Sequence, residues 1–382
     1  MFSRKTALYV KENIGNFFMI VHNYCTLFDS KYLNRGLAMY ESLKTYDKNF
    51  HLYIFAFDEF TEKMLKELNL SEVTVISLGE FEDNELLSVK QSRTKVEYYW
   101  TCTASTIKYC IEKFNLDSCT YVDADIYFYG NPSVLLEEMG NNSVLITPHW
   151  YTPVYDESER SGIYCVQFVS FRNTIQGMDV LNWWRKECIN WCYARFENGK
   201  FGDQKYLDNW PEKFKGVYVL KNRGGGVAPW NVQQYDLKNA PEFIIKEKKT
   251  GKSFPLIFYH YHYLRFLLSG DMDLGPYVLS HSVIEKLYIP YILNLTKINR
   301  NLEQRGYKKD LYVEVLPKNN WKTYVRKNIA KINILVYFFF YLFNKLPCKF
   351  WRNSRNNSLN LLKKILVLLI IPDNIVRFTE KK

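Results

Sequence analysis

Short apolar runs alternate with segments of helical periodicity along most of the chain. Runs of strand length predict β-strands at residues 17–21, 50–57, 73–78, 120–128, 143–147, 166–171, 217–220 and 256–263. Apolar residues at helical spacing predict helices at residues 33–45, 61–68, 101–114, 180–192 and 203–209. Strands that alternate with helices are typical of a mostly parallel sheet joined by right-handed crossovers. The pattern therefore predicts the α/β class.

One predicted strand carries two acidic residues inside an apolar and aromatic run. Residues 120–128 read Thr-Tyr-Val-Asp-Ala-Asp-Ile-Tyr-Phe, with the carboxylates at Asp123 and Asp125. Burying a carboxylate is costly unless another group pairs with it. Alternate residues of an extended segment point to one face, so the two carboxylates are expected to converge. Two converging oxygen ligands are what a divalent cation needs when it also holds phosphates.

The alternative is that this Asp-x-Asp triplet caps a helix or lies in a solvated turn, where such triplets are common. Its aromatic and aliphatic neighbours are poor turn residues, and Gly130, Asn131 and Pro132 supply a turn afterwards, which favours the metal site. In open α/β sheets, ligands bind outside the carboxyl ends of the strands. We therefore expect one cluster from the polar residues that follow strands: residues 22–34, Asp58, Asp123 and Asp125.

The composition is that of a globular protein with free thiols. The chain has 382 residues, 47% of them hydrophobic, which suffices for one large α/β domain with an extension or for two domains. Its eight cysteines lack a paired metal-ligand spacing, and Cys188 and Cys192, one helical turn apart, are expected in the core. No signal peptide and no glycine-rich phosphate loop is visible. These features predict a protein of the reducing cytoplasm.

The positive charge is concentrated in the last part of the chain. Residues 317–382 hold 14 Lys and Arg against two acidic residues, so the rest of the chain is nearly neutral. Two apolar runs, residues 334–343 and 359–371, are too short to span a bilayer, which takes about 20 apolar residues. Helices lying on the anionic inner face of the plasma membrane are expected from about residue 317, the alternative being a helical subdomain packed on the α/β domain. No nucleic-acid-binding motif accompanies the charge.

Six segments resemble, in order, a known family. They are residues 23–33, 55–59, 97–105, 202–208, 227–231 and 258–262. Together they resemble bacterial GT-A fold glycosyltransferases close to glycosyltransferase family 8, which includes lipopolysaccharide and surface-polysaccharide sugar transferases. The resemblance covers roughly residues 17–265 and implies a catalytic domain at residues 15–275 and a helical basic and apolar C-terminal extension at residues 276–382. The chain departs from the family at residues 164–168, at the Gly224–Gly226 loop and just after residue 262.

The resemblance also implies site residues. It assigns a nucleotide site to Asn23, Cys25, Thr26, Asp58, Trp100, Ser105 and Asp123. It assigns Mn²⁺ (or Mg²⁺) to Asp123 and Asp125, with His260 or His262 as a further ligand and His260 preferred. It assigns the reacting sugar to Asp203 and Gln204, and the acceptor sugar to Trp230 and Asn231. Each assignment has a structural alternative: Asp203 as a helix cap, Trp230 and the histidines as core residues, and the three glycines as a mobile loop instead of backbone close to a ligand.

The activity implied by the resemblance is metal-dependent transfer of a hexose from a nucleotide-diphosphate sugar, first of all a UDP-sugar, to a glycan or lipid-linked acceptor. Such transfer would serve lipopolysaccharide, capsule or other surface-polysaccharide synthesis, with retention of configuration. Lys95 and Arg265 are candidates to neutralise the phosphates, although each suits a solvated surface charge as well. Two alternatives stay open: a metal-dependent phosphohydrolase acting on a nucleotide, and a non-catalytic scaffold at the membrane surface. The pattern does not indicate the oligomeric state.

Overall fold

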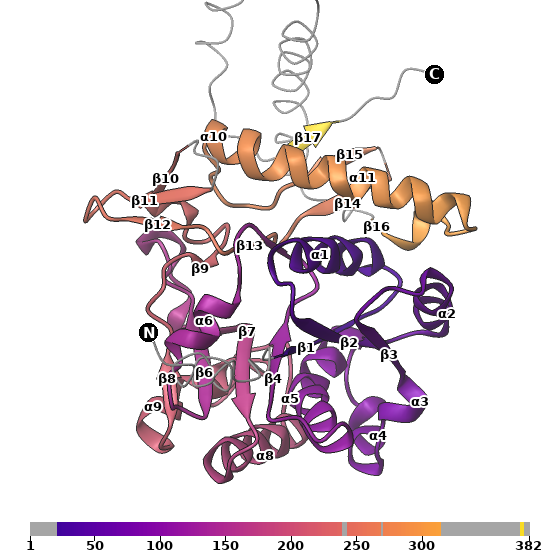
Figure 1. Ribbon diagram of the computed structural model, residues 1–382, viewed down its shortest axis with the longest axis vertical. Helices are drawn as coiled ribbons and strands as arrows, with labels where there is room; N and C mark the ends of the chain where they lie inside the picture. The colour runs from indigo at the N-terminus through magenta and orange to yellow at the C-terminus, as the bar shows by residue number, and fades with distance from the viewer. Residues whose placement is uncertain (1–20, 239–242, 269, 315–374, 378–382) are drawn as a thin grey trace, which may run out of the picture.

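A seven-stranded sheet forms the centre of the protein in a computed structural model, which describes residues 21–238, 243–268, 270–314 and 375–377. The strand order is β3-β2-β1-β4-β7-β6-β8, and only β7 runs antiparallel to its neighbours in this sheet (Figure 1). The strands are β1 (His22–Phe28), β2 (Phe50–Ala56), β3 (Val73–Ser77), β4 (Ser118–Val122), β6 (Val144–Pro148), β7 (Tyr164–Arg172) and β8 (Val217–Val219). The predicted α/β class with a mostly parallel sheet is confirmed.

Helices cover both faces of this sheet. They are α1 (Leu33–Tyr46), α2 (Glu59–Leu68), α3 (Leu78–Phe81), α4 (Asn84–Lys90), α5 (Lys95–Lys113), α6 (Ser133–Glu138), α7 (Ser158–Ser161), α8 (Ile175–Asn190) and α9 (Trp210–Lys213). Alternate residues of β1 enter two cores: Tyr24 packs on the side of α1 and α2, and Leu27 on the side of α5 and α8 (Figure 1). The strands are therefore buried on both faces, as expected of a parallel sheet.

Side-chain caps fix where α2, α5 and α8 begin. Thr94 accepts a hydrogen bond from the Glu97 backbone N–H, while the Glu97 carboxylate bonds the Thr94 backbone N–H, which completes a capping box. This box starts α5 at Lys95, several residues before the predicted start, so residues 97–105 lie inside the helix. Asp58 and Thr174 cap α2 and α8 more simply: each side chain accepts one hydrogen bond from a backbone N–H of the first helical turn.

A second, smaller sheet meets the carboxyl end of β4. It consists of β5 (Ile126–Phe128), β13 (Phe258–His260) and β9 (Gly225–Val227), with β13 in the middle. The three glycines expected to form a loop lie at and beside β9 and are buried by packing. A Cβ at Gly224 would lie 1.9 Å from the Pro255 carbonyl oxygen, so only glycine allows this close approach.

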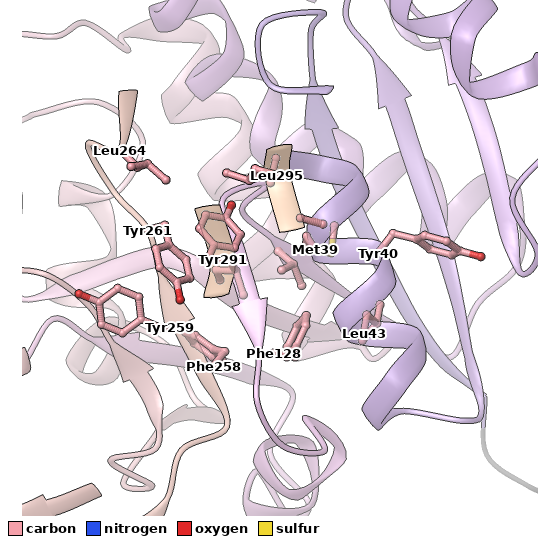
Figure 2. Close-up of a cluster of buried hydrophobic side chains, with 14 of the residues drawn as sticks. Met39, Tyr40, Leu43, Phe128, Phe258, Tyr259, Tyr261, Leu264, Tyr291 and Leu295 are labelled. Atoms are coloured by element: carbon pink, nitrogen blue, oxygen red, sulfur yellow. The ribbon is translucent and has the colours of Figure 1, made fainter. Parts of the chain in front are cut away.

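The chain after residue 275 packs back onto the first domain. It includes α10 (His281–Val283), a π-helical turn (Ile284–Tyr288) and α11 (Ile289–Gln304), which lies beside α1 (Figure 1). Tyr291 of α11 stacks on Tyr261 with ring centroids 3.7 Å apart, in the same buried cluster as Leu43 and Phe128 (Figure 2). A buried hydrogen bond of 2.9 Å joins the Asn34 and Asn299 side chains. The predicted boundary at residue 275 thus separates two segments that share one core.

Two further sheets and four 3₁₀ turns complete the described part of the chain. They are the sheet of β10 (Tyr235–Lys238), β11 (Ile244–Glu247) and β12 (Ser253–Pro255), the sheet of β14 (Arg265–Leu267), β15 (Asp271–Asp273), β16 (Val313–Glu314) and β17 (Ile375–Arg377), and the 3₁₀ turns Pro153–Tyr155, Lys205–Asn209, Val232–Gln234 and Lys309–Leu311. Most of the basic tail, where the membrane-associating segment was predicted, lies outside the described residues. Within the ranges described, no helix has the length and hydropathy of a membrane span.

The first strand differs from its prediction. The apolar run at residues 17–21 falls almost wholly outside the described residues, and the first described strand covers His22–Phe28, which was expected to be a loop. The segment fits a strand because its buried side chains alternate between the two cores and the polar side chain among them is small. Thr26 is fully buried between apolar neighbours.

Candidate functional site

A turn at the carboxyl end of β4 places the two carboxylates of the Asp-x-Asp triplet. β4 ends at Val122, and the Ile126 backbone N–H donates to the Asp123 carbonyl at 3.2 Å, so the chain reverses into β5. The triplet thus follows the end of a strand, as predicted, but it forms a turn and not the extended segment that was expected to align the two carboxylates. Two sheets meet at this triplet, and the change of direction between them requires the turn. The carboxylates still converge, because the turn folds Asp125 back toward Asp123.

His260 completes a group of three potential ligands. It ends β13, opposite Ile126 of β5. Its Nε2 lies 3.1 Å from Asp125 Oδ1 and 3.9 Å from Asp123 Oδ2. All three donor atoms lie within 4.8 Å of one another, a spread that fits ligands of a single ion. The Asp123 side chain is 28% exposed, against 11% for Asp125 and 6% for His260, so Asp123 marks the open side of the group.

The charges in this group depend on one another. Burial raises the pKa of Asp123 to about 6, and the charge of Asp125 acts in the same direction. For Asp125, burial alone would raise the pKa, but the adjacent His260 outweighs it and lowers the pKa to about 2. Burial would likewise lower the pKa of His260, and the charge of Asp125 together with their hydrogen bond raises it well above its usual value. Without a cation, the imidazolium therefore neutralises part of the charge that a divalent ion would neutralise.

The second histidine of the pair lies apart from the carboxylates. His262 follows the end of β13, and its ring centroid is 5.6 Å from that of His260. Burial, followed by the charge of His260, lowers the pKa of His262 to about 4, so this ring is neutral near pH 7. Of the two histidines, the structure brings His260 to the carboxylates.

Gln167 of β7 contacts the ring nitrogen of His260 that does not face the carboxylates. Its Oε1 lies 2.8 Å from His260 Nδ1, and its backbone carbonyl accepts from the Asp123 N–H at 3.1 Å. The residue is fully buried. The sequence identified residues 164–168 only as a departure from the family. A polar residue among the apolar residues of a central strand was the available signal.

Asp203 and Gln204 lie in the loop before a 3₁₀ turn. Asp203 is 5% exposed, and burial raises its pKa to about 7, with the charge of Asp123 acting in the same direction. The Gln204 Nε2 donates to the Ser161 carbonyl at 2.8 Å. Gln204, not Asp203, occupies the cap position of the turn, and it makes no side-chain cap bond. The electrostatic influence of Asp123 on Asp203 links this loop to the carboxylate group.

The carboxyl ends of β1 and β2 form a second polar group. Asp58 accepts from the Ser30 backbone N–H at 2.9 Å and from the Thr61 backbone N–H at 2.7 Å, so it joins this edge to α2. Asp29 accepts from the Tyr99 hydroxyl at 2.9 Å and pairs with Lys95 at 2.7 Å. Asp29 and Tyr99 were not singled out, although Asp29 directly follows the strand.

Three residues predicted for the nucleotide lie within β1. Asn23 is at its start, the end opposite to Asp29. Cys25 is fully buried, and its thiol clusters with those of Cys110 and Cys119 in the core. Thr26 is fully buried, and its hydroxyl has no hydrogen-bond partner among the described residues. These residues lie in a strand and not in the loop that was predicted, and Cys25 pairs with Tyr121, two residues before Asp123. Their contact with a nucleotide stays a prediction.

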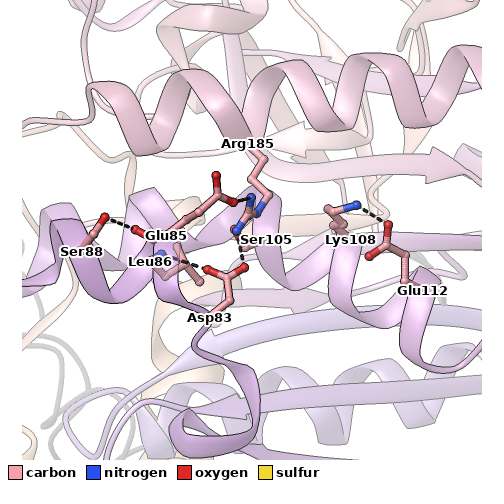
Figure 3. Close-up of polar contacts among 8 residues, drawn as sticks. All are labelled: Asp83, Glu85, Leu86, Ser88, Ser105, Lys108, Glu112 and Arg185. Carbon is pink, nitrogen blue, oxygen red and sulfur yellow. Dashed lines mark hydrogen bonds and ion pairs between the residues drawn. The ribbon is translucent and has the colours of Figure 1, made fainter.

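Two further predicted residues lie on α5. Ser105 accepts from Arg185 Nε at 3.0 Å, and Arg185 also pairs with Asp83 and Glu85, which ties α8 to α4 and α5 (Figure 3). Ser105 therefore belongs to a contact between helices. Trp100 packs against Phe201 with ring centroids 6.2 Å apart, close to the loop that contains Asp203.

Trp230 and Asn231 are buried residues beside the two histidines. The Trp230 ring meets those of His260 and His262 at centroid distances of 5.3 and 5.4 Å, and its Nε1 donates to the His149 carbonyl at 2.9 Å. Asn231 is fully buried; its amide group donates to the carbonyls of His149 and Gly226, and its oxygen accepts from the Ala228 N–H. Both side chains thus support the site from inside the protein.

Two arginines, Arg35 and Arg265, lie near the carboxylate and histidine group. Arg35 is buried, donates to the Leu264 carbonyl at 2.7 Å and contributes to the low pKa of Asp125. Arg265, a predicted phosphate ligand, pairs with Glu314 at 3.3 Å. Arg35 therefore acts on Asp125, while the charge of Arg265 is balanced in part by Glu314.

Comparisons with known proteins add relatives and structural neighbours. No family model matches the chain. Crystal structures of similar shape include a galactosyltransferase, LgtC, with donor and acceptor sugar analogues (TM-score 0.44, 12% identity, 75% of this chain and 100% of that chain). Others are mouse xyloside xylosyltransferase 1 (0.41, 12%, 64% and 98%) and the glycosyltransferase GlyE of Streptococcus pneumoniae TIGR4 (0.41, 14%, 78% and 66%). These TM-scores are low, so the likeness is one of overall shape and carries no functional conclusion.

Two proteins of Bacillus subtilis (strain 168) are related in sequence. The uncharacterized protein YfnD is 29% identical over 289 residues, which cover 73% of this chain and 90% of YfnD. The uncharacterized protein YfnF is 30% identical over 257 residues, which cover 65% of this chain and 84% of YfnF. The chain therefore belongs to the protein family of YfnF.

Proposed function

We propose that the protein is a glycosyltransferase of the GT-A type that depends on a divalent cation. The observation that carries the proposal is the group Asp123, Asp125 and His260, which stands at the carboxyl end of a central strand. Ligands of open α/β sheets bind at this edge, and a cation that holds a diphosphate takes only one or two carboxylates from the protein. The donor set of two carboxylate oxygens and one imidazole nitrogen fits Mn²⁺ or Mg²⁺, with Mn²⁺ more tolerant of the nitrogen.

The protein's own residues would orient the donor. Asp123, Asp125 and His260 would hold the cation, and Asp123, the most exposed of the three, would be the ligand most open to the donor. The cation, when bound, would supply Lewis-acid stabilisation of the departing nucleoside diphosphate. Asp29 and Asp58, at the ends of the neighbouring strands, would accept hydrogen bonds from the nucleoside in this proposal.

The transferred group is a hexose in this proposal, and its nearest protein neighbours are Asp203 and Gln204. The proximity of Asp203 to Asp123, visible in their electrostatic coupling, supports this position. In a retaining transferase, a side chain beside the anomeric carbon stabilises the oxocarbenium-like state on the face opposite the leaving group. The acceptor would be a glycan of lipopolysaccharide, capsule or another surface polysaccharide. A contact of Trp230 or Asn231 with that acceptor stays a prediction.

The proposal also places the enzyme on an anionic membrane through its basic tail. Support comes from the charge distribution, since 14 Lys and Arg follow residue 316 together with short apolar runs. Basic and apolar segments of this kind suit the surface of an anionic leaflet. A lipid-linked acceptor would be presented at the same surface.

Calorimetric titration of UDP, with and without Mn²⁺, tests the donor site. Wild type is expected to bind UDP in a Mn²⁺-dependent manner, and Asp125→Asn to weaken that binding at least tenfold, or about 1.4 kcal/mol. Asp179→Asn, the same change at an exposed position of α8, should bind as wild type. Mn²⁺-dependent binding that survives in Asp125→Asn would contradict the proposal. Acceptor-independent release of inorganic phosphate from a nucleotide would indicate a phosphohydrolase instead.

A further inference from the structure

Gln167 touches both sides of the carboxylate and histidine group. Its side-chain Oε1 lies 2.8 Å from His260 Nδ1, and the opposite ring nitrogen, Nε2, lies 3.1 Å from Asp125 Oδ1. Its backbone carbonyl accepts from the Asp123 N–H at 3.1 Å. One residue of β7 therefore contacts the turn that carries Asp123 and the ring that faces Asp125.

We propose that Gln167 is a positioning residue that fixes the tautomer and the orientation of His260 for cation binding. The inference rests on the proposed function. An amide oxygen only accepts hydrogen bonds, so the proton of this contact belongs to His260 Nδ1. In the neutral ring, Nε2 then carries the lone pair, and this is the atom that faces the two carboxylates. A hydrogen-bonded partner behind a ligating histidine also increases its basicity and restricts its rotation.

The cost of burying this amide supports a role in the site. Gln167 is fully buried, and its Nε2 has no hydrogen-bond partner among the residues the structure describes. Its neighbours Phe168 and Val169 are apolar and equally buried, as befits a central strand. An apolar residue would avoid the unpaired amide nitrogen, so packing alone does not account for glutamine here.

The neutrality of the glutamine matches the charge of the site. With His260 neutral, Asp123 and Asp125 together carry two negative charges, which a divalent cation balances. A glutamate at residue 167 would add a third negative charge in a buried place. Glutamine supplies the acceptor for Nδ1 without that charge. Cys165, two residues earlier on the same face of β7, also contacts His260. Two side chains of one strand therefore contact this ring.

The test replaces the acceptor while keeping the size of the side chain. Mn²⁺ binding to the full chain is followed by electron paramagnetic resonance of the free ion, with and without UDP. Gln167→Met, which cannot accept from Nδ1, is expected to weaken Mn²⁺ binding about 10- to 100-fold. Gln167→Glu keeps an acceptor and should remain closer to wild type than Gln167→Met. Gln176→Met makes the same change at an exposed position of α8 and should bind Mn²⁺ as wild type.

A second readout reports the tautomer directly. With ¹⁵N-labelled histidine and diamagnetic Mg²⁺, the His260 resonances, assigned with His260→Gln, should show a protonated Nδ1 in wild type. Gln167→Met should lose this signature. An Nε2-protonated neutral ring in wild type with Mg²⁺ would overturn the inference even if Gln167→Met does not fold.

The outcomes separate this inference from the function on which it rests. If wild type and a folded Gln167→Met bind Mn²⁺ equally, the positioning role is wrong while the cation site stands. If wild type binds no Mn²⁺ with or without UDP, both the cation site and the role of Gln167 fall.

Discussion

At the scale of single residues, close backbone packing decides which positions accept a side chain. Gly224 lies where β9 meets the end of β12, so closely that a Cβ would reach within 1.9 Å of a backbone oxygen. A Cβ at Gly79, in α3, would have no other part of the protein within 4 Å, and the backbone there does not need glycine. Both glycines look alike in the sequence, because the atoms that distinguish them are distant along the chain.

Replacing each of these glycines by alanine should therefore have opposite effects. Gly224→Ala is expected to lower the free energy of unfolding by about 1–3 kcal/mol, because the backbone at Pro255 must move. Gly79→Ala should leave stability unchanged or raise it by up to about 1 kcal/mol, because alanine favours the helix. Urea unfolding followed by circular dichroism measures both. Equal stability of Gly224→Ala and wild type would show that this approach of the backbone is looser than the structure indicates.

Single residues also show which parts of the candidate site can be predicted from the sequence and which cannot. Asp123, Asp125 and His260 could be predicted, because carboxylates in an apolar run and a late histidine are visible as a pattern. The segment that contains Asn23 and Cys25 was predicted to be a loop and is a strand, because a strand with several polar residues resembles a loop in composition. Gln167 could not be assigned, since its partner His260 is 93 residues away and only the fold brings them together.

At the scale of elements, the C-terminus of α1 is fixed to β1 by one carboxylate. Asp47 ends α1 and is 2% exposed; its Oδ2 lies 2.7 Å from His22 Nδ1 and accepts from the Tyr24 hydroxyl at 3.0 Å. Its Oδ1 accepts from the Asn49 backbone N–H at 3.0 Å. Burial alone would raise the pKa of Asp47, but these bonds outweigh it and lower the pKa below 3.8.

The lowered pKa gives this link a definite pH dependence. A carboxylate with a depressed pKa in the folded state contributes stability above its unfolded pKa and loses it as the pH falls through the folded value. Asp47→Asn is expected to cost about 1–3 kcal/mol at pH 7. The difference from wild type should shrink as the pH falls below 3.8, the ordinary value for the group. Urea titrations from pH 7 to acid measure it, and a difference independent of pH would contradict the assignment.

Element types were predicted better than their ends, for a physical reason. The periodicities of β2, β3, α1 and α2 depend on neighbouring residues, and these elements lie close to where they were expected. The turn between β4 and β5 depends on the pairing of β5 with β13, which is more than a hundred residues away. The early start of α5 depends on a capping box whose two residues are only three positions apart, so this start could have been predicted from the sequence.

At the scale of the whole molecule, charge divides the chain into two parts. The first 316 residues are nearly neutral, and the last part carries 14 Lys and Arg. The shared core of α1 and α11 shows that the described chain up to residue 314 packs as one body. A basic segment that follows a packed domain can bring the whole domain to an anionic surface. This arrangement underlies the membrane part of the proposed function.

Sedimentation of the full chain with lipid vesicles tests that arrangement. Binding is expected to vesicles with phosphatidylglycerol, to be weaker with phosphatidylcholine alone, and to fall as salt screens the charges. Lys363→Gln with Lys364→Gln removes two charges from the second apolar run, which should cost about 2 kcal/mol, or roughly 30-fold in affinity. Lys248→Gln with Lys249→Gln removes two exposed charges between β11 and β12 and should leave binding unchanged. Equal loss in both pairs would show that the protein responds only to total charge, and no binding to either lipid would remove the membrane from the proposed function.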